Sequence, residues 1–147
     1  MKKILKKEEI LSAIEKGIKK YENLDLLGRY AMYMGVAQIL EFGLKKLYKE
    51  KYGSTLEEIQ KWTLGKTKNE LSNKGLRPSF IILLESVVES RNYIAHEMLT
   101  NYVLMRSVSE NLKTESYSKD IRFLDRAIYE LEQIIFLFDW TNHNNAW

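Results

Sequence analysis

The residues with the clearest chemical potential lie close together, in the segment Ser-Arg-Asn-Tyr-Ile-Ala-His-Glu-Met at positions 90–98. A histidine side chain exchanges protons near neutral pH, and an arginine can hold phosphate or carboxylate through its planar guanidinium. His96 follows Asn92 by four positions, so the two side chains are neighbours on one face of a helix. Arg91 directly precedes Asn92. Together the three residues could bind an anion and move a proton beside it.

An amphipathic pattern that begins near Pro78 predicts a helix over residues 79–102, which carries this segment. At about 100° per residue, one arc of the helix is apolar and faces the core. The arc is made of Leu83, Leu84, Val87, Val88, Ile94, Ala95, Met98 and Leu99. The opposite, polar face carries Glu85, Glu89, Asn92 and His96.

Arg91 falls in the middle of the apolar arc, about 140° from His96 on an ideal helix. A buried guanidinium needs a partner, because desolvating an unpaired charge costs several kcal/mol. Arg91 is therefore expected to form a structural ion pair, to extend to solvent, or to face a site where an anion binds. For His96, the alternative to a catalytic role is a plain surface histidine. Glu89, on the same face as His96, could tune the pKa of the imidazole.

The rest of the sequence predicts helices and no strand. We therefore expect an all-α bundle of four or five helices that forms a single domain over residues 1–147. A short or irregular piece is expected at 65–75, and a connection that could be partly helical at 106–119. Apolar residues at three- and four-residue spacing predict the helices 4–20, 26–52, 54–62, 79–102 and 121–138.

Small residues give further detail in the second predicted helix and after it. Gly53 should end this helix, and a hydroxyl group of Ser54 or Thr55 should cap the next one. Gly28, Ala31 and Gly35 lie within the helix at three- and four-residue spacing. Their small size should let another helix approach closely.

Composition and charge restrict the classes of function. The 147 residues are 45% hydrophobic and 29% charged with one proline, which is typical of a globular domain. The absence of cysteine excludes disulfides and thiolate metal sites. Glu8 and Glu9 follow the N-terminal lysines where a signal peptide would have an apolar run, so we expect a cytoplasmic protein without membrane contact. A formal charge of +3 permits a polyanionic partner without requiring one.

Two other signals do not define a functional site. Leu-Gly-Lys-Thr at 64–67 is similar to the end of a phosphate-binding P-loop, but Gln60 stands where that motif needs a glycine. His96 and His143 are the two histidines of the chain, and two imidazoles without cysteine give little support for a structural metal site. We therefore expect no metal and no cofactor.

The run Arg91-Asn92-Tyr93-Ile94-Ala95-His96 resembles the signature of the HEPN superfamily. That signature is an arginine, a polar residue directly after it, and a histidine after four to six intervening residues. In the family it lies on a late helix of a small all-α bundle, as expected here. The resemblance in helical order covers nearly the whole chain, whereas at residue level it is confined to about 91–97.

Many HEPN proteins are metal-independent endoribonucleases that act as homodimers in toxin–antitoxin or anti-phage defence systems. The resemblance implies that two motif helices meet across a two-fold axis and form one composite site that cleaves RNA. By this resemblance His96 exchanges protons with the 2′-hydroxyl or the 5′-oxygen leaving group, and Arg91 holds the phosphate. Asn92 would orient His96 or the substrate. The implied products are a 2′,3′-cyclic phosphate and a 5′-hydroxyl end.

One position departs from the related toxins that are paired with a small nucleotidyltransferase antitoxin. Those toxins often carry a tyrosine two residues after the histidine, which the antitoxin modifies, whereas this chain has Met98. A nucleotidyltransferase-type antitoxin is thus an expected partner, but this chain lacks the tyrosine that such an antitoxin usually modifies. Two other interpretations stay open. One is a non-catalytic HEPN module that binds a nucleotide, RNA or a partner protein, and the other is a helical interaction protein whose Arg91 closes an ion pair.

Overall fold

The computed structural model describes the backbone of residues 3–105 and 110–147, and the side chains of 3–103 and 119–147. The described residues form helices and no strand, so the prediction of an all-α bundle is confirmed. The elements are α1 (Lys7–Ile18), the short 3₁₀ helix η1 (Lys19–Tyr21), α2 (Leu26–Tyr52), α3 (Leu56–Ile59), α4 (Leu64–Asn73), α5 (Pro78–Tyr93), the π-helix η2 (Ile94–Met98), α6 (Leu99–Met105) and α7 (Glu110–His143).

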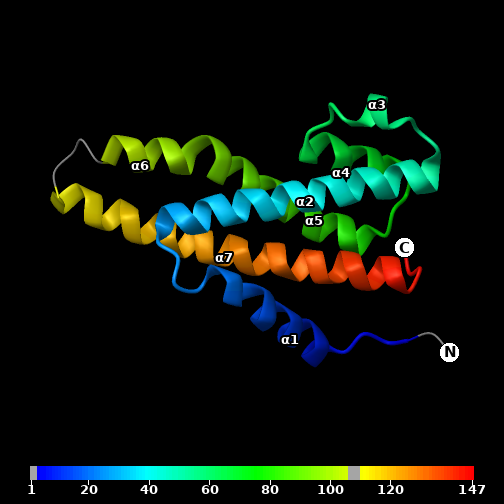
Figure 1. Cartoon of the computed structure of the whole chain (residues 1–147), viewed down its shortest axis with the longest axis horizontal. Coiled ribbons are helices and arrows are strands. Elements are labelled where there is room, and N and C mark those ends of the chain that lie inside the picture. The colour runs from blue at the N-terminus through cyan, green and yellow to red at the C-terminus, as the bar shows by residue number, and fades with distance from the viewer. Residues whose placement is uncertain (1–2, 106–109) are drawn as a thin grey trace.

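Three long helices run along the length of the bundle (Figure 1). The segments α5, η2 and α6 follow one another without a break, and α7 returns beside them in the opposite direction. Helix α7 also packs against α1 and α2, while α4 packs against α5. Buried side chains of these helices belong to one hydrophobic cluster, in which Tyr33, Leu44, Leu84, Leu124 and Leu131 are fully buried.

The ends of several helices follow from local chemistry. The carboxylate of Asp25, which was not singled out from the sequence, accepts a hydrogen bond from the Gly28 N–H at 2.8 Å and caps α2. Gly53 ends that helix with φ of 73°, a left-handed conformation that suits glycine. Thr55 caps α3 through the Glu58 N–H, and Pro78 is the first residue of α5.

Two segments are more helical than the sequence suggested. Residues 64–73 form a regular helix, α4, where a short or irregular piece was expected. Residues 110–119, expected to be a connection that could be partly helical, belong to α7, and the remaining part of that connection, 106–109, lies outside the described residues. The stretch 110–119 has no apolar stripe but also no glycine or proline, so a helix that is stabilised further along can extend through it.

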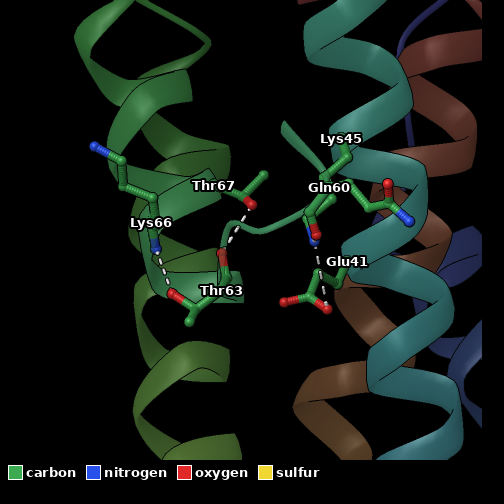
Figure 2. Close-up of polar contacts among 6 residues, drawn as sticks. All are labelled: Glu41, Lys45, Gln60, Thr63, Lys66 and Thr67. Atoms are coloured by element: carbon green, nitrogen blue, oxygen red, sulfur yellow. Dashed lines mark hydrogen bonds and ion pairs between the residues drawn. The ribbon is translucent and has the colours of Figure 1, made fainter. Parts of the chain in front are cut away.

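The Leu-Gly-Lys-Thr segment is the capped start of α4 (Figure 2). The Thr63 hydroxyl accepts a hydrogen bond from the Lys66 N–H at 3.1 Å, and the Thr67 hydroxyl donates to the Thr63 carbonyl at 2.8 Å. Lys66 Nζ lies 2.7 Å from the Glu70 carboxylate. Lys45, a buried residue of α2, donates to the Gln60 carbonyl at 3.2 Å and so holds the preceding turn. These groups are engaged in holding the fold, which agrees with the rejection of a P-loop.

The expected close approach to Gly28, Ala31 and Gly35 is absent within the described part of the chain. A Cβ added at Gly35 would meet nothing within 4 Å, and the nearest atoms to one at Gly28 belong to Asp25 and Leu24, just before the same helix. Ala31 is exposed. The glycine that does permit a close contact is Gly17 of α1, because a Cβ there would overlap the buried carboxylate of Glu132 on α7. That carboxylate forms an ion pair with Lys20 and fixes α1 to α7.

Within the described ranges, no helix has the combination of length and apolarity that a membrane span requires.

Candidate functional site

The segment that carries Arg91 and His96 is the point where the long helix stops being an α-helix. Helix α5 ends at Tyr93, and His96 is the central residue of the π-helix Ile94–Met98. At the junction, the Ile94 N–H is shared between the carbonyls of Ser90 and Arg91. π-helices are rare, occur mostly as single turns inside α-helices, and are frequent at functional sites.

The π turn changes the angle between the two candidate residues. Hydrogen bonds in a π-helix reach five residues along the chain where those of an α-helix reach four, so each turn holds more residues. Consecutive side chains are therefore separated by a smaller rotation. Arg91 and His96 are five positions apart and consequently lie closer in direction than the 140° of a uniform α-helix. The expectation from an ideal helix overstated their separation.

The predicted polar face is present on α5 and η2. Glu89, Asn92 and His96 are exposed, and Glu85 is half-buried. Lys68 of α4 forms an ion pair with the Glu85 carboxylate. Glu89 precedes His96 by two turns, about 10.5 Å along a helix axis, so it can influence the imidazole only at long range. No contact among the described residues supports the proposed tuning role of Glu89.

Arg91 lies in the apolar arc as predicted and is half-buried. Its neighbours on that face, Leu84, Val87, Ile94 and Met98, are each at most 2% exposed. The Arg91 Nη1 donates a hydrogen bond to the Asn92 Oδ1 at 3.4 Å, which links the first two residues of the motif. Among the described residues Arg91 forms no ion pair, so the structural salt bridge considered above is not found in that part of the chain.

Leu99 is the exception on the apolar face, because it is 36% exposed where burial was expected. It follows the π turn and begins α6, which packs less extensively on α7 than α5 does. The buried apolar face predicted for a uniform helix therefore ends at η2.

A polar cluster from three helices lies on the buried side of Arg91. Tyr33 of α2 is completely buried, and its hydroxyl has no hydrogen-bond partner among the described residues. Burial raises the pKa of Tyr33, the negative charge of Glu130 on α7 raises it further, and the positive charge of Arg91 opposes both. The Ser86 hydroxyl of α5 donates to the Glu130 carboxylate at 3.0 Å. The buried Tyr33 hydroxyl thus lies within electrostatic reach of both Arg91 and the Glu130 carboxylate, which is already hydrogen-bonded to Ser86.

Tyr93, inside the motif, attaches the end of α5 to α7. Its hydroxyl donates to the Asp120 Oδ1 at 3.4 Å, and its ring lies 4.5 Å from the Phe123 ring between centroids. Burial raises the pKa of Tyr93, with a further contribution from the nearby Asp120 carboxylate. Burial also raises the pKa of Asp120, whereas the hydrogen bond from Tyr93 and the charge of Lys119 lower it. These contacts hold the backbone of the motif in place.

Sequence reasoning did not identify Tyr33, Ser86, Tyr93, Asp120 or Glu130. Four of them lie outside the motif, and Tyr33, Asp120 and Glu130 belong to other helices, so no spacing rule connects them to Arg91. A role for Tyr93 could have been suspected, because it is an aromatic residue with a hydroxyl group inside the motif. Its partners on α7 are known only from the packing of α5 on that helix.

The remaining predicted elements of the site are separate from this cluster. Met98, which replaces the tyrosine modified in related toxins, is 2% exposed, so the position is closed to an external enzyme in this conformation. His143 lines a surface cavity of about 500 Å³ with residues of the C-terminal end of α7. In the part of the chain that the structure describes, no three His, Cys, Asp or Glu side chains are grouped to hold a metal ion.

Protein-family models, curated proteins and solved structures give no match to this chain. The fold and the site define a small all-α bundle that presents arginine, asparagine and histidine around a π turn.

Proposed function

We propose that this chain is a HEPN-type, metal-independent endoribonuclease of a toxin–antitoxin or anti-phage defence system. The observation that carries the proposal is the coincidence of the Arg-Asn-x3-His motif with the π turn. A π turn interrupts regular hydrogen bonding, and such interruptions are frequent at functional sites. The exposure of Asn92 and His96 and the half-buried position of Arg91 support a site that substrate can reach.

The proposed reaction is an attack of the RNA 2′-oxygen on the adjacent phosphorus. His96 accepts the proton of the 2′-hydroxyl as the new bond to phosphorus forms, or donates a proton to the 5′-oxygen as its bond to phosphorus breaks. Arg91 binds the non-bridging phosphate oxygens, where negative charge increases during the reaction. Asn92, which is hydrogen-bonded to Arg91, orients the guanidinium or the substrate. The products are a 2′,3′-cyclic phosphate and a 5′-hydroxyl end.

We propose that two copies meet through the helix that carries the motif. Three exposed apolar residues on this helix support such an interface: Ile82, Leu99 and Val103 are 71%, 36% and 61% exposed. In an isologous dimer each contact that these side chains make across the interface occurs twice, and each His96 has a counterpart on the partner. One imidazole can then accept the proton while the other donates one.

The test is cleavage of RNA by the purified full chain in the presence of EDTA. His96→Ala should lower the rate by about 10²-fold or more, the usual contribution of a general acid or base. His143→Ala is the matched control, because it removes the other imidazole of the chain, and it should cleave at the wild-type rate. DNA and RNA with a methylated 2′-oxygen should both be inert, since each lacks the nucleophile. Equal cleavage by the His96→Ala and wild-type proteins would end the proposal.

A second candidate, a non-catalytic HEPN module that binds RNA, a nucleotide or a partner protein, is favoured by the surroundings of His96. A catalytic histidine is usually oriented by a hydrogen bond to its second nitrogen, and the described side chains provide no such partner. Glu97, next to it, and Glu89 are exposed carboxylates without an ion pair in the described ranges. Under this function Arg91→Ala weakens ligand binding, His96→Ala does not, and no substrate is turned over.

If the chain is a toxin, its antitoxin acts by a route other than modification at position 98. Burial of Met98 supports this proposal together with the absence of a hydroxyl group there. A nucleotidyltransferase-type partner that modified this chain should transfer its group to another residue, and mass mapping after co-expression would identify which one.

A further inference from the structure

One face of α2 is exposed and apolar along most of the helix. Leu27, Ile39 and Phe42 are 48%, 71% and 64% exposed, and the small residues Ala31 and Gly35 lie between them. On a helix these five residues fall within about 120° of one another. The opposite side of α2 contributes to the core through Leu26, Tyr33, Ala37, Leu40, Leu44, Leu47 and Tyr48.

The exposed face needs an explanation because soluble monomers seldom present a continuous apolar strip of this length. From Leu27 to Phe42 the strip extends roughly 22 Å at 1.5 Å per residue, with Gln38 as the exposed polar residue in that arc. No described side chain approaches Gly35, where an added Cβ would meet nothing within 4 Å. Small residues in the middle of a helix face allow a second helix to come close, and the chain itself does not supply that helix in its described part.

We propose that the occupant is α2 of a second copy of this chain, running antiparallel. The first argument is shape. When the two helices cross midway between Gly35 and Ile39, Ile39 of each copy faces Gly35 of the other. A large side chain thus meets a position without a side chain on both sides of the two-fold axis. An isologous interface requires this self-complementarity.

The second argument is charge. The exposed acidic residues Glu22 and Asp25 lie just before α2, which begins at Leu26, whereas the exposed Lys46 and Lys49 lie near its end. Lys49 forms no ion pair among the described residues, and Lys46 is 3.9 Å from Glu50 in its own helix. An antiparallel pair puts the acidic end of one copy beside the basic end of the other, whereas a parallel pair puts like charges together.

This interface is separate from the one proposed for the motif helix and does not depend on ribonuclease activity. It uses α2, whereas the catalytic proposal uses α5, η2 and α6. If both interfaces form, the chain assembles as a dimer of dimers, and loss of the α2 contact halves the mass. If the α2 interface forms alone, its loss gives a monomer.

Gly35→Arg tests the proposal with little risk to folding. The position is open in a single copy, and replacing glycine in a helix interior favours the helix. Sedimentation of the wild-type full chain from low to high micromolar concentration should show association, and Gly35→Arg should halve the mass. Asn69→Arg, on an exposed position of α4, is the matched control and should leave the mass unchanged. A wild-type mass that is monomeric throughout, or one that Gly35→Arg does not change, overturns the proposal.

Charge reversal tests the antiparallel arrangement. Glu22→Lys and Lys49→Glu should each weaken self-association several-fold, because each places like charges together at both ends of the interface. A mixture of the two variants should associate more tightly than either alone, since both ends of the mixed pair then carry opposite charges. Asp25 is left intact because its carboxylate caps α2. A mixture no tighter than its components would rule out this pairing.

Discussion

Arg91 is half-buried and forms no ion pair with the described residues. Asn92 accepts a hydrogen bond from the guanidinium, and the charge of Arg91 acts on the buried Tyr33 hydroxyl together with that of Glu130. Because the charge of the guanidinium is only partly neutralised, some of its N–H donors stay available to an incoming anion. In a bidentate salt bridge those donors would already be bound to a carboxylate. The surroundings therefore support the anion-binding role over the structural one.

The buried Tyr33 hydroxyl predicts a specific loss of stability at alkaline pH. Its pKa is raised from the ordinary 10.0, first by burial and then by Glu130. The folded state therefore retains this proton where the unfolded state loses it. Stability is unaffected below about pH 10 and falls as the pH rises through the folded pKa, by up to about 1.4 kcal/mol per pH unit.

Tyr33→Phe should remove that alkaline loss. Urea unfolding of the variant and the wild type from about pH 8 to 11 should give free energies that diverge only above about pH 10, where the variant becomes relatively more stable. Near pH 8 the variant should be equal to the wild type or slightly more stable, since the hydroxyl has no hydrogen-bond partner among the described residues. Parallel curves over the whole range would contradict the assignment.

At the scale of the elements, the π turn η2 acts as a single added residue in a long helix. Pro78 and the apolar spacing were enough to predict that the helix exists and where it begins. The π turn was not predictable, because its residues have ordinary helical character and no spacing of apolar residues distinguishes a π turn from an α-helical one. The geometry of a uniform α-helix therefore placed Arg91 correctly on the apolar arc but overstated its angle to His96.

Removing one residue from η2 should restore a uniform α-helix at little cost in stability. If the π turn accommodates an insertion, deletion of Glu97, which is exposed, leaves α5 and α6 packed as they are. The thermal midpoint should stay within a few degrees of the wild type. RNA cleavage should be lost, because the orientation of His96 relative to Arg91 changes although their spacing in sequence does not.

Deletion of Glu89 is the control for that experiment. Glu89 is also exposed but lies in the regular part of α5, so its removal rotates one part of the helix by about 100° against the other. Buried residues such as Leu84 and Ile94 could not then face the core together, and the variant should unfold at a much lower temperature. Equal destabilisation by the two deletions would show that η2 is not an accommodated insertion.

At the scale of the whole molecule, the sequence predicted the fold class and the polar face of the site, but not how copies assemble. Gly28, Ala31 and Gly35 on α2 were expected to let another helix approach closely, and in the described part of the chain no helix does so while Ala31 and Gly35 stay exposed. Periodicity identifies an apolar face without saying whether the same chain covers it. For the same reason, the helical periodicity does not show whether Arg91 and His96 act within one copy or across two.

Mixing two inactive variants decides between those arrangements. In a site composed across a dimer, Arg91→Ala supplies an intact His96 and His96→Ala supplies an intact Arg91, so a mixed dimer keeps one of each on opposite sides of the interface. After subunit exchange, cleavage should rise clearly above that of either variant alone, but stay well below the wild-type rate because the second imidazole is missing. Because the π turn brings the two side chains closer in direction, a site within one copy is the competing arrangement, and it predicts no restoration.

Val103→Glu, introduced into both inactive variants, controls for the interface. Val103 is 61% exposed on α6, so its substitution should not disturb the fold of one copy but should place two carboxylates together where motif helices meet. Restoration should then disappear, while Gly35→Arg in the same two variants should leave it intact because α2 forms a different interface. Restoration that survives Val103→Glu and disappears with Gly35→Arg would instead mean that the composite site forms across α2.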